Sequence, residues 1–347
     1  MPARAPHPDG PGASHGPENP VDPAHPDGPD RPDGPDRPDA SDHPVINVVG
    51  ATATGKSELA IALAQRLGGE IINADAMQFY RGMDIGTAKL TPGERGGIAH
   101  HLLDILDVDE DASVATFQRE ARALITAIRG RGHVPILVGG SGLYVRAATD
   151  RMAFPGTDPQ VRARLEAEAH DHGSTVLHRR LAGLDPEAAR TIAPADTRRV
   201  VRALEVLEIT GEPFSAQLPR YEYALPTVQV GLALDRATLH ERIAARVERM
   251  WEAGWVDEVR ALLPRGLLTG TTARQAIGYA QIVDLLAGRV AELAARESTI
   301  VRTRQFAKRQ DTWFRRDPRI RWLPAGASAV DRALEVLGAD GGAQRQR

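Results

Sequence analysis

Residues 45–57 read VINVVGATATGKS, and this stretch says more about the architecture than any other. Its first part, Val45 to Val49, is a short apolar run rich in β-branched residues, as expected of a buried parallel strand. Gly50 to Ser57 then match the pattern G-x-x-x-x-G-K-[ST], whose glycines let backbone N–H groups turn toward an anion at the start of a helix. We therefore predict a phosphate-binding loop between a strand and a helix that runs from Gly55 to about Arg66.

The residues of this loop have different roles. Lys56 would bridge phosphate oxygens, and the Ser57 hydroxyl would take a magnesium position, because Mg2+ prefers oxygen ligands and bridges phosphates. The motif does not say whether a nucleotide such as ATP gives up a phosphoryl group, as in a kinase, or whether a diphosphate departs, as in a prenyltransferase. The predicted phosphate-binding residues are Gly50, Ala51, Thr52, Ala53, Thr54, Gly55, Lys56 and Ser57.

Strand and helix patterns alternate beyond the loop. Such alternation predicts an α/β fold, a P-loop NTPase-like doubly wound parallel sheet. We expect further strands at Glu70 to Ala74, Val134 to Val138 and Val228 to Leu234, and helices at Ser113 to Gly130, about Arg236 to Ala253 and about Val290 to Thr312.

A purely helical block interrupts the sheet from Asp158 to about Gly211. Asp158-Pro159 and Asp185-Pro186 are helix starts, since Asp caps a helix and Pro fits its first turn. The block therefore predicts an inserted helical subdomain. The expected domains are a tail at 1–43, a catalytic core at 44–155 and 226–324, the insertion at 156–225, and a C-terminal tail at 325–347.

Composition limits the remaining choices. Residues 1–44 hold three Arg against eight Asp and one Glu, a charge of −6, and the tail is rich in Pro, Asp and Gly, so we predict that it is disordered. Cysteine is absent, which excludes disulfides and thiolate chemistry and fits the cytoplasm. No apolar run is long enough to cross a bilayer, so we expect no membrane partner. We expect a monomer.

Two segments place polar groups at the carboxyl edge of the predicted sheet, where α/β folds bind ligands. Asp75 follows the second strand and could accept a proton from a substrate, or it could only cap a turn. Gly139 to Tyr144 ends the third strand with three glycines and places the Ser141 hydroxyl in the same crevice, although a bare tight turn is an alternative.

Taken together, the segments resemble the tRNA dimethylallyltransferases, across roughly residues 45–323. The strings that carry the resemblance are Gly50 to Ser57, Asp75 to Tyr80 (DAMQFY), Gly82 to Lys89 (GMDIGTAK), His101 to Ile105 (HLLDI), Gly139 to Tyr144 (GGSGLY) and Lys308 to Trp313 (KRQDTW). The third and sixth strings are the most specific. Two positions depart from the family pattern: Ala76 stands where serine is usual, and Ser141 replaces threonine.

The resemblance implies a reaction and its residues. Dimethylallyl diphosphate would give its prenyl group to the exocyclic amine of the adenosine on the 3′ side of the anticodon, tRNA position 37, and release diphosphate. Asp75 would be the general base, Ser141 would orient the reacting groups, and Arg246, with Arg242 one turn away, would bind diphosphate beside Mg2+.

The resemblance also implies contacts with the tRNA anticodon stem-loop. Phe79 and Tyr80 could stack on a splayed base or fill core space, and the basic segment Arg296 to Arg321 suits a polyanion or is merely a solvated helix. The implied contact residues are Asp75, Ala76, Met77, Gln78, Ser141, Arg164, Arg198, Arg199, Arg202, Arg274, Gln275, Gly278, Tyr279, Lys308, Arg309, Gln310, Trp313 and Arg315.

Three other functions stay open. A small-molecule kinase would use Lys56 on ATP and Asp75 on an acceptor hydroxyl. A prenyltransferase for free adenine nucleotides would share the core but would not need the arginines of the insertion. A nucleotide-switched RNA-binding module would tolerate Asp75→Asn.

Overall fold

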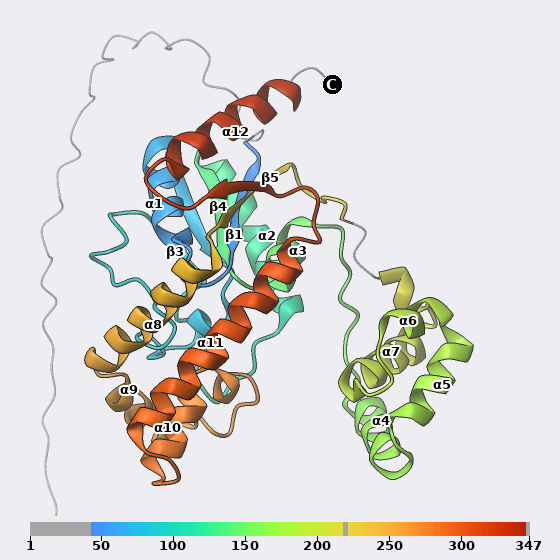
Figure 1. The fold of residues 1–347 in the computed structure, drawn as a ribbon. Helices are drawn as coiled ribbons and strands as arrows, with labels where there is room; N and C mark the ends of the chain where they lie inside the picture. Colours follow the sequence, from blue (N-terminus) through green and yellow to red (C-terminus); the bar gives the residue numbers. More distant parts are fainter. Residues whose placement is uncertain (1–42, 218–220, 345–347) are drawn as a thin grey trace, which may run out of the picture. The chain divides into compact units, whose positions relative to one another are not determined.

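The frame of the chain is a six-stranded sheet in a computed structural model that describes residues 43–217 and 221–344 (Figure 1). Its strands lie in the order β3-β2-β4-β1-β5-β6, and every neighbouring pair is parallel, which confirms the predicted doubly wound α/β class. The strands are β1 (Val45–Gly50), β2 (Gly69–Asn73), β3 (His100–His101), β4 (Val134–Gly139), β5 (Thr227–Ala233) and β6 (Arg321–Pro324).

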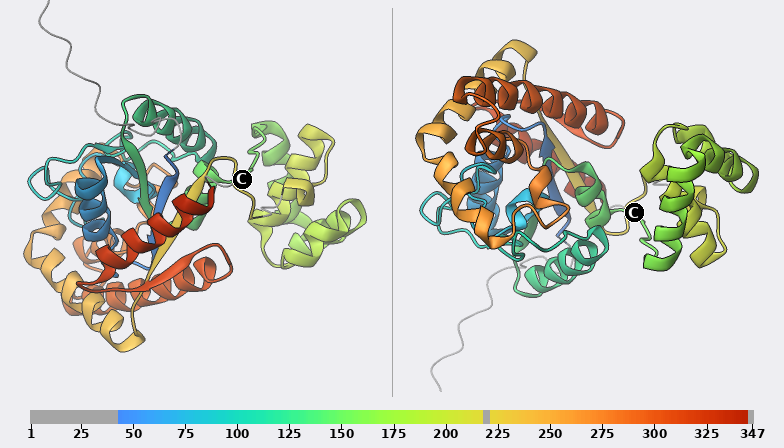
Figure 2. Two further views of the ribbon diagram at one scale, coloured as in Figure 1. Left: turned by 90° about the horizontal axis from the view of Figure 1, so that it is seen from above. Right: turned by 90° about the horizontal axis from the view of Figure 1, so that it is seen from below.

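Both faces of the sheet are apolar, because successive side chains of a strand point to opposite sides. Val45 and Val49 of β1 face helices α2 (Val114–Gly130) and α3 (Gly142–Thr149). Ile46 and Val48 face α1 (Lys56–Leu67) and α12 (Ala329–Gln344). Helices accordingly lie on both sides of the sheet in the two views of Figure 2.

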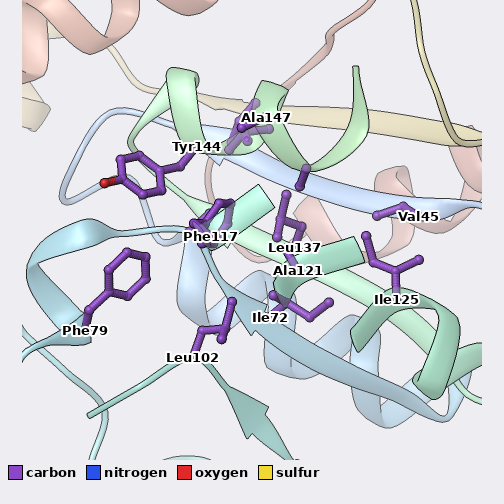
Figure 3. Close-up of a cluster of buried hydrophobic side chains, with 14 of the residues drawn as sticks. Val45, Ile72, Phe79, Leu102, Phe117, Ala121, Ile125, Leu137, Tyr144 and Ala147 are labelled. Carbon is purple, nitrogen blue, oxygen red and sulfur yellow. The ribbon is translucent and has the colours of Figure 1, made fainter. Parts of the chain in front are cut away.

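The core under α2 and α3 reaches the carboxyl edge of the sheet (Figure 3). There Phe79, Phe117 and Tyr144 pack against one another, with ring centroids 5.0–5.7 Å apart. Phe79 belongs to the short 3-10 helix η2 (Ala76–Phe79), which directly follows Asp75. The aromatic cluster thus fixes the position of the segment that starts with Asp75.

The predicted insertion has its own core. It consists of α4 (Pro159–His172), α5 (Ser174–Leu184), α6 (Pro186–Thr191), α7 (Thr197–Thr210) and η3 (Phe214–Gln217). Leu165, Leu181 and Leu204 are buried together inside it. The predicted caps are confirmed. The Asp158 carboxylate accepts from the amides of Gln160 and Val161, and the Asp185 carboxylate accepts from the amide of Ala188.

Helices form a third apolar cluster after β5. They are α8 (Arg236–Glu252), α9 (Trp255–Leu262), α10 (Tyr279–Leu286) and α11 (Glu292–Phe314), with the short turns η4 (Leu263–Arg265) and η5 (Ala273–Gln275). Trp251, Trp255 and Tyr279 pack edge to face at its centre, together with Tyr80 and Met83. The predicted helices α8 and α11 are present, and α9 and α10 are additions to the prediction.

The edge strands and both ends of the chain differ from the prediction or lie outside the described residues. The edge strands β3 and β6 have only two and four residues, too few for a hydrophobic pattern to announce them. The C-terminal segment, expected as a tail, contains α12, because the small side chains of Ala329 and Ala333 let it pack closely beside α1 on strands β5 and β6. Of the predicted N-terminal tail, residues 1–42 lie outside the described part, as do 345–347.

Candidate active site

The phosphate loop closes in front of α1 through its glycines. Gly50 leaves β1 with φ 138°, and a Cβ there would lie 2.8 Å from the Leu232 carbonyl oxygen. Gly55 has φ 96° and directly precedes the first turn of α1. The Thr54 hydroxyl donates to the Ala51 carbonyl at 2.8 Å, which fixes the turn between them. The loop therefore presents the electropositive start of a helix to the space in front of it.

That space is a cavity of about 720 Å3. Its walls come from segments that are distant in sequence and meet at the carboxyl edge of the sheet, as the fold requires. The lining includes Thr52, Ala53, Gly55, Lys56, Ser57, Glu58, Asn73, Asp75, Gln78, Asp84, Ile85, Thr87, Ala88, Lys89, Gly139, Gly140, Arg242, Arg246, Arg249, Phe306 and Gln310. The predicted phosphate loop, Asp75 and Arg246 are thus brought together.

Asp75 caps a turn and also lines the cavity. Its Oδ1 accepts from the amide of Met77 at 3.0 Å, which starts η2. Its own amide donates to the side chain of Asn73 at 3.0 Å. Burial raises the pKa of the Asp75 carboxyl, while the hydrogen bond from Met77 and the charges of Lys56 and Arg246 lower it. The held carboxylate can accept a proton in a site that also contains two cations.

Lys56 and Arg246 supply positive charge to the cavity. Burial, and then the nearby Arg246, lowers the pKa of Lys56 to about 8. Lys56 Nζ donates to the Ala51 carbonyl at 2.7 Å, and the Arg246 guanidinium donates to the Thr52 hydroxyl at 3.3 Å. Two cations held close to a helix start suit a ligand with several negative charges, such as a diphosphate.

Gln310 has a different role from the one predicted. It was expected to contact tRNA, but its side chain is 6% exposed and points into the protein. Its Oε1 accepts from the Thr52 amide at 2.8 Å, and its Nε2 donates to the Gly140 carbonyl at 2.9 Å. The side-chain amide of Gln310 thus connects α11 to the phosphate loop through Thr52 and to the glycine turn through Gly140.

The glycine turn brings Ser141 to the start of α3. A Cβ on Gly139 would lie 2.5 Å from the Ala74 carbonyl, and one on Gly142 would lie 1.9 Å from the Trp313 ring, so both positions need glycine. Ser141 itself precedes α3 and its side chain makes no hydrogen bond to the first turn. The cavity lining contains the neighbouring Gly139 and Gly140 rather than Ser141. Trp313, expected to contact tRNA, covers Gly142 with part of its ring.

Several aromatic and glycine positions predicted for RNA contact lie in the core. Phe79 and Tyr80 are 2% and 0% exposed, which decides for the core-filling alternative. Tyr279 is fully buried, and its hydroxyl donates to Glu258 Oε1 at 2.6 Å. A Cβ on Gly278 would lie 1.9 Å from the Trp255 ring. The prediction of tRNA contact is wrong for the side chain of Tyr279, because packing encloses it.

Most of the predicted basic contacts are exposed, and several of them also have partners within the chain. Arg164 forms an ion pair with Glu208, and the half-buried Arg202 binds the Pro155 and Gly156 carbonyls and the buried Glu205. Arg315 pairs with Asp311 and lies over the Trp322 ring, and Arg199 lies 3.5 Å from Asp196. The exposed members are Arg164, Arg198, Arg199, Arg274, Gln275, Lys308, Arg309 and Arg315, and Ala76 and Met77 are half-buried. Lys308, Arg309 and Trp313 line a second cavity, of about 480 Å3, on α11.

Sequence inspection missed charged residues in the wall of the main cavity and behind it. Lys89 Nζ is buried between the carboxylates of Asp84 and Asp104, 2.6 Å from each. Arg249 lines the cavity one turn beyond Arg246, a helical spacing that the sequence does contain. Glu258 accepts amides of the Gly82 to Lys89 string, and no local pattern announces a contact 172 to 174 residues away.

Two features of the described residues bear on partners. None of their helices has the length and apolar character that crossing a membrane requires. In the same part of the chain, no cluster of three or more histidine, aspartate or glutamate side chains could hold a metal ion.

Comparisons with known proteins point in one direction. Residues 78–317 match the sequence model of the IPP transferase family. Two proteins named tRNA dimethylallyltransferase are similar to this chain. That of Thermobifida fusca is 60% identical over 299 residues, which cover 84% of this chain and 94% of the relative. That of Streptomyces coelicolor is 61% identical over 284 residues, which cover 82% of this chain and 91% of the relative.

Solved structures give the same result. The full-length tRNA isopentenylpyrophosphate transferase from Bacillus halodurans is 40% identical with a TM-score of 0.63, over 86% of this chain and 96% of that one. A eukaryotic dimethylallyltransferase acting on tRNA is 29% identical with a TM-score of 0.73, over 84% and 78%. Each of the four names describes a transferase for tRNA.

Proposed function

We propose that this chain, which belongs to the IPP transferase family, transfers the dimethylallyl group of dimethylallyl diphosphate to tRNA. The acceptor is the exocyclic amine of the adenosine on the 3′ side of the anticodon, position 37, and the other product is diphosphate. One observation carries the proposal: the Asp75 carboxylate shares a cavity with Lys56, Arg246 and the phosphate loop. A proton acceptor and a diphosphate site are thereby close enough to act on one reaction.

The reaction follows from the chemistry of these groups. The amine nitrogen forms a bond to the first carbon of the prenyl group, the carbon–oxygen bond breaks, and diphosphate leaves with the electron pair. Asp75 accepts the proton that the nitrogen loses. Lys56, Arg246 and the amides of residues 55–57 at the start of α1 stabilise the charge that grows on the leaving diphosphate. The position of the amine nitrogen against the first prenyl carbon matters as much as this charge stabilisation, because an exocyclic amine is a weak nucleophile.

Ser141 directly precedes α3 and follows Gly139 and Gly140, which line the cavity. We propose that it orients the reacting groups, as the family resemblance implies.

A magnesium ion fits the donors of the site. Ser57 lines the cavity as the last residue of the phosphate loop and offers a hydroxyl oxygen, the kind of ligand that Mg2+ prefers. No protein cage of three acidic or histidine ligands stands among the described residues, so substrate oxygens and water would complete the coordination. When bound, the ion neutralises negative charge on the diphosphate.

For tRNA we propose contacts through the exposed basic residues. Arg198 and Arg199 of the insertion and Lys308 and Arg309 of α11 are accessible to phosphates. Gln78 lies beside Asp75 in the cavity, where a base that has left its stack would enter. The remaining proposed contacts are Ala76, Met77, Arg164, Arg274, Gln275 and Trp313.

Transfer of labelled dimethylallyl from its diphosphate to unmodified tRNA, with magnesium present, tests the function. Parallel reactions offer AMP as acceptor, or γ-labelled ATP as donor with small hydroxyl compounds as acceptors. We expect label in tRNA at the adenosine 3′ to the anticodon. Label in AMP alone would assign the chain to nucleotide prenylation, phosphate transfer would make it a kinase, and tRNA binding without any transfer would leave an RNA-binding module.

A further inference from the structure

The string Gly82 to Lys89 forms one wall of the cavity, and Glu258 of α9 holds it. Glu258 Oε2 accepts from the amides of Asp84 at 2.9 Å and Ile85 at 2.6 Å, and Oε1 accepts from the amide of Gly86 at 3.2 Å. The same Oε1 accepts from the Tyr279 hydroxyl at 2.6 Å. One carboxylate thus binds three consecutive amides of a segment that is far away in the sequence.

Three successive backbone N–H groups that converge on one point form an anion-binding concavity. Here a side chain supplies the anion, and hydrogen bonds to an ionised group are stronger than those between neutral groups. The space behind the segment is closed, because a Cβ on Gly86 would lie 2.1 Å from Trp255 Nε1 and 2.5 Å from the Tyr279 ring. Tyr279 keeps its proton for this bond, since burial and the charge of Glu258 raise its pKa well above the ordinary value.

Lys89 anchors the far end of the string. Lys89 Nζ donates to the Tyr80 carbonyl at 2.8 Å and pairs with Asp84 and Asp104. Between the two anchors, Thr87 lines the cavity, and its carbonyl accepts from Nε2 of Gln78 at 3.0 Å. The contacts therefore run from Glu258 through the string to Gln78, which lies three residues from Asp75.

We propose that Glu258 is a positioning residue for prenyl transfer: it holds the cavity wall formed by Gly82 to Lys89 and thereby orients Gln78 beside Asp75. This inference rests on the proposed function. The phosphate loop is fixed by separate contacts, to Arg246 and Gln310. Loss of Glu258 therefore disturbs the acceptor side of the cavity and leaves the diphosphate side intact.

Glu258→Gln tests the inference, because it keeps the shape of the side chain and removes its charge. The matched control is Asp257→Asn, the neighbouring carboxylate on the same helix, which is exposed and pairs with Arg260. For each variant, kcat for tRNA prenylation is measured together with the Kd of dimethylallyl diphosphate in the absence of tRNA. We expect Glu258→Gln to lower kcat by roughly 100-fold, the effect of a small misplacement of reacting groups, with an unchanged Kd.

A general loss of structure would weaken both quantities together, so the split between kcat and Kd separates positioning from destabilisation. An unchanged kcat for Glu258→Gln, or a parallel loss of affinity for the diphosphate, would overturn the inference. Tyr279→Phe keeps the packed ring and removes one donor from Glu258, and it decides the matter if Glu258→Gln does not fold: a lower kcat at unchanged Kd supports the role and an unchanged kcat overturns it. Absence of transfer in the unmutated chain and in Asp257→Asn would instead reject the proposed function itself.

Discussion

At Asp75, burial and nearby charge act in opposite directions on one carboxyl group. Burial is the larger effect and raises the pKa, so the carboxyl is protonated at a higher pH than an ordinary aspartate. A protonated carboxyl cannot accept the proton of the substrate amine. Prenyl transfer should therefore decrease as the pH falls, and the decrease should begin above the ordinary pKa of aspartate.

Asp75→Asn removes this proton acceptor and keeps the size of the side chain. We expect transfer to fall by roughly 100- to 10,000-fold, the usual effect of losing a general base, while tRNA binding is retained. The measurement is single-turnover prenylation beside a binding assay. An asparagine variant that transfers at the original rate would show that Asp75 only caps η2.

Lys56 gives a second dependence on pH, with the opposite sign. Its pKa in the free protein is about 8, and the bound diphosphate favours the charged form. Affinity for dimethylallyl diphosphate should therefore fall as the pH rises through 8, and binding just above that pH should take up a proton. Calorimetry in buffers of different ionisation enthalpy measures the uptake. Lys56→Arg, which stays charged, should show neither effect, and a constant affinity from pH 7 to pH 9 in the unmutated chain would contradict the assignment.

At the level of elements, α11 has two faces with different tasks. Gln310 points inward and binds the phosphate loop and the glycine turn, while Lys308 and Arg309 point outward and are exposed. We expect Gln310→Ala to weaken the binding of dimethylallyl diphosphate roughly tenfold, as a loss of about 1.4 kcal/mol would.

The double variant Lys308→Ala, Arg309→Ala should weaken tRNA binding and leave the affinity for dimethylallyl diphosphate unchanged. Titration of both ligands against both variants checks this, and equal effects on the two ligands would refute the division.

The elements also show what a sequence can predict. The phosphate loop and the caps Asp158 and Asp185 were predictable, because their contacts stay within a few residues. The inward role of Gln310 was not, since it depends on partners 170 and 258 residues away. Tyr279 was assigned to tRNA contact from the family resemblance, which identifies matching positions in the sequence but does not show whether a side chain is buried.

On the scale of the whole molecule, the chain separates chemistry from the recognition of a large partner. The cavity is lined by the phosphate loop and α1, by the string Gly82 to Lys89, and by α8 and α11, whereas the insertion has an apolar core of its own. Arg202 serves the junction between them, because it binds the carbonyls of Pro155 and Gly156 where the chain leaves the core. This explains why Arg202 is only partly accessible, while its neighbours Arg198 and Arg199 are exposed.

The exposed arginines of the insertion should act on tRNA through phosphate charge alone. Replacing both Arg198 and Arg199 by Ala should weaken tRNA binding and lower the slope of log K against log salt by roughly 1.4, about 0.7 for each single-strand phosphate that an arginine no longer neutralises. The Kd of dimethylallyl diphosphate should not change, since neither residue lines the cavity. The matched control is Arg289→Ala, which replaces an exposed arginine outside the insertion that pairs with Asp284 of α10. If the double variant binds tRNA with the original salt slope, Arg198 and Arg199 do not contact RNA phosphates. Arg164 and Arg202 would then have to exchange their carboxylate partners for phosphates when tRNA binds.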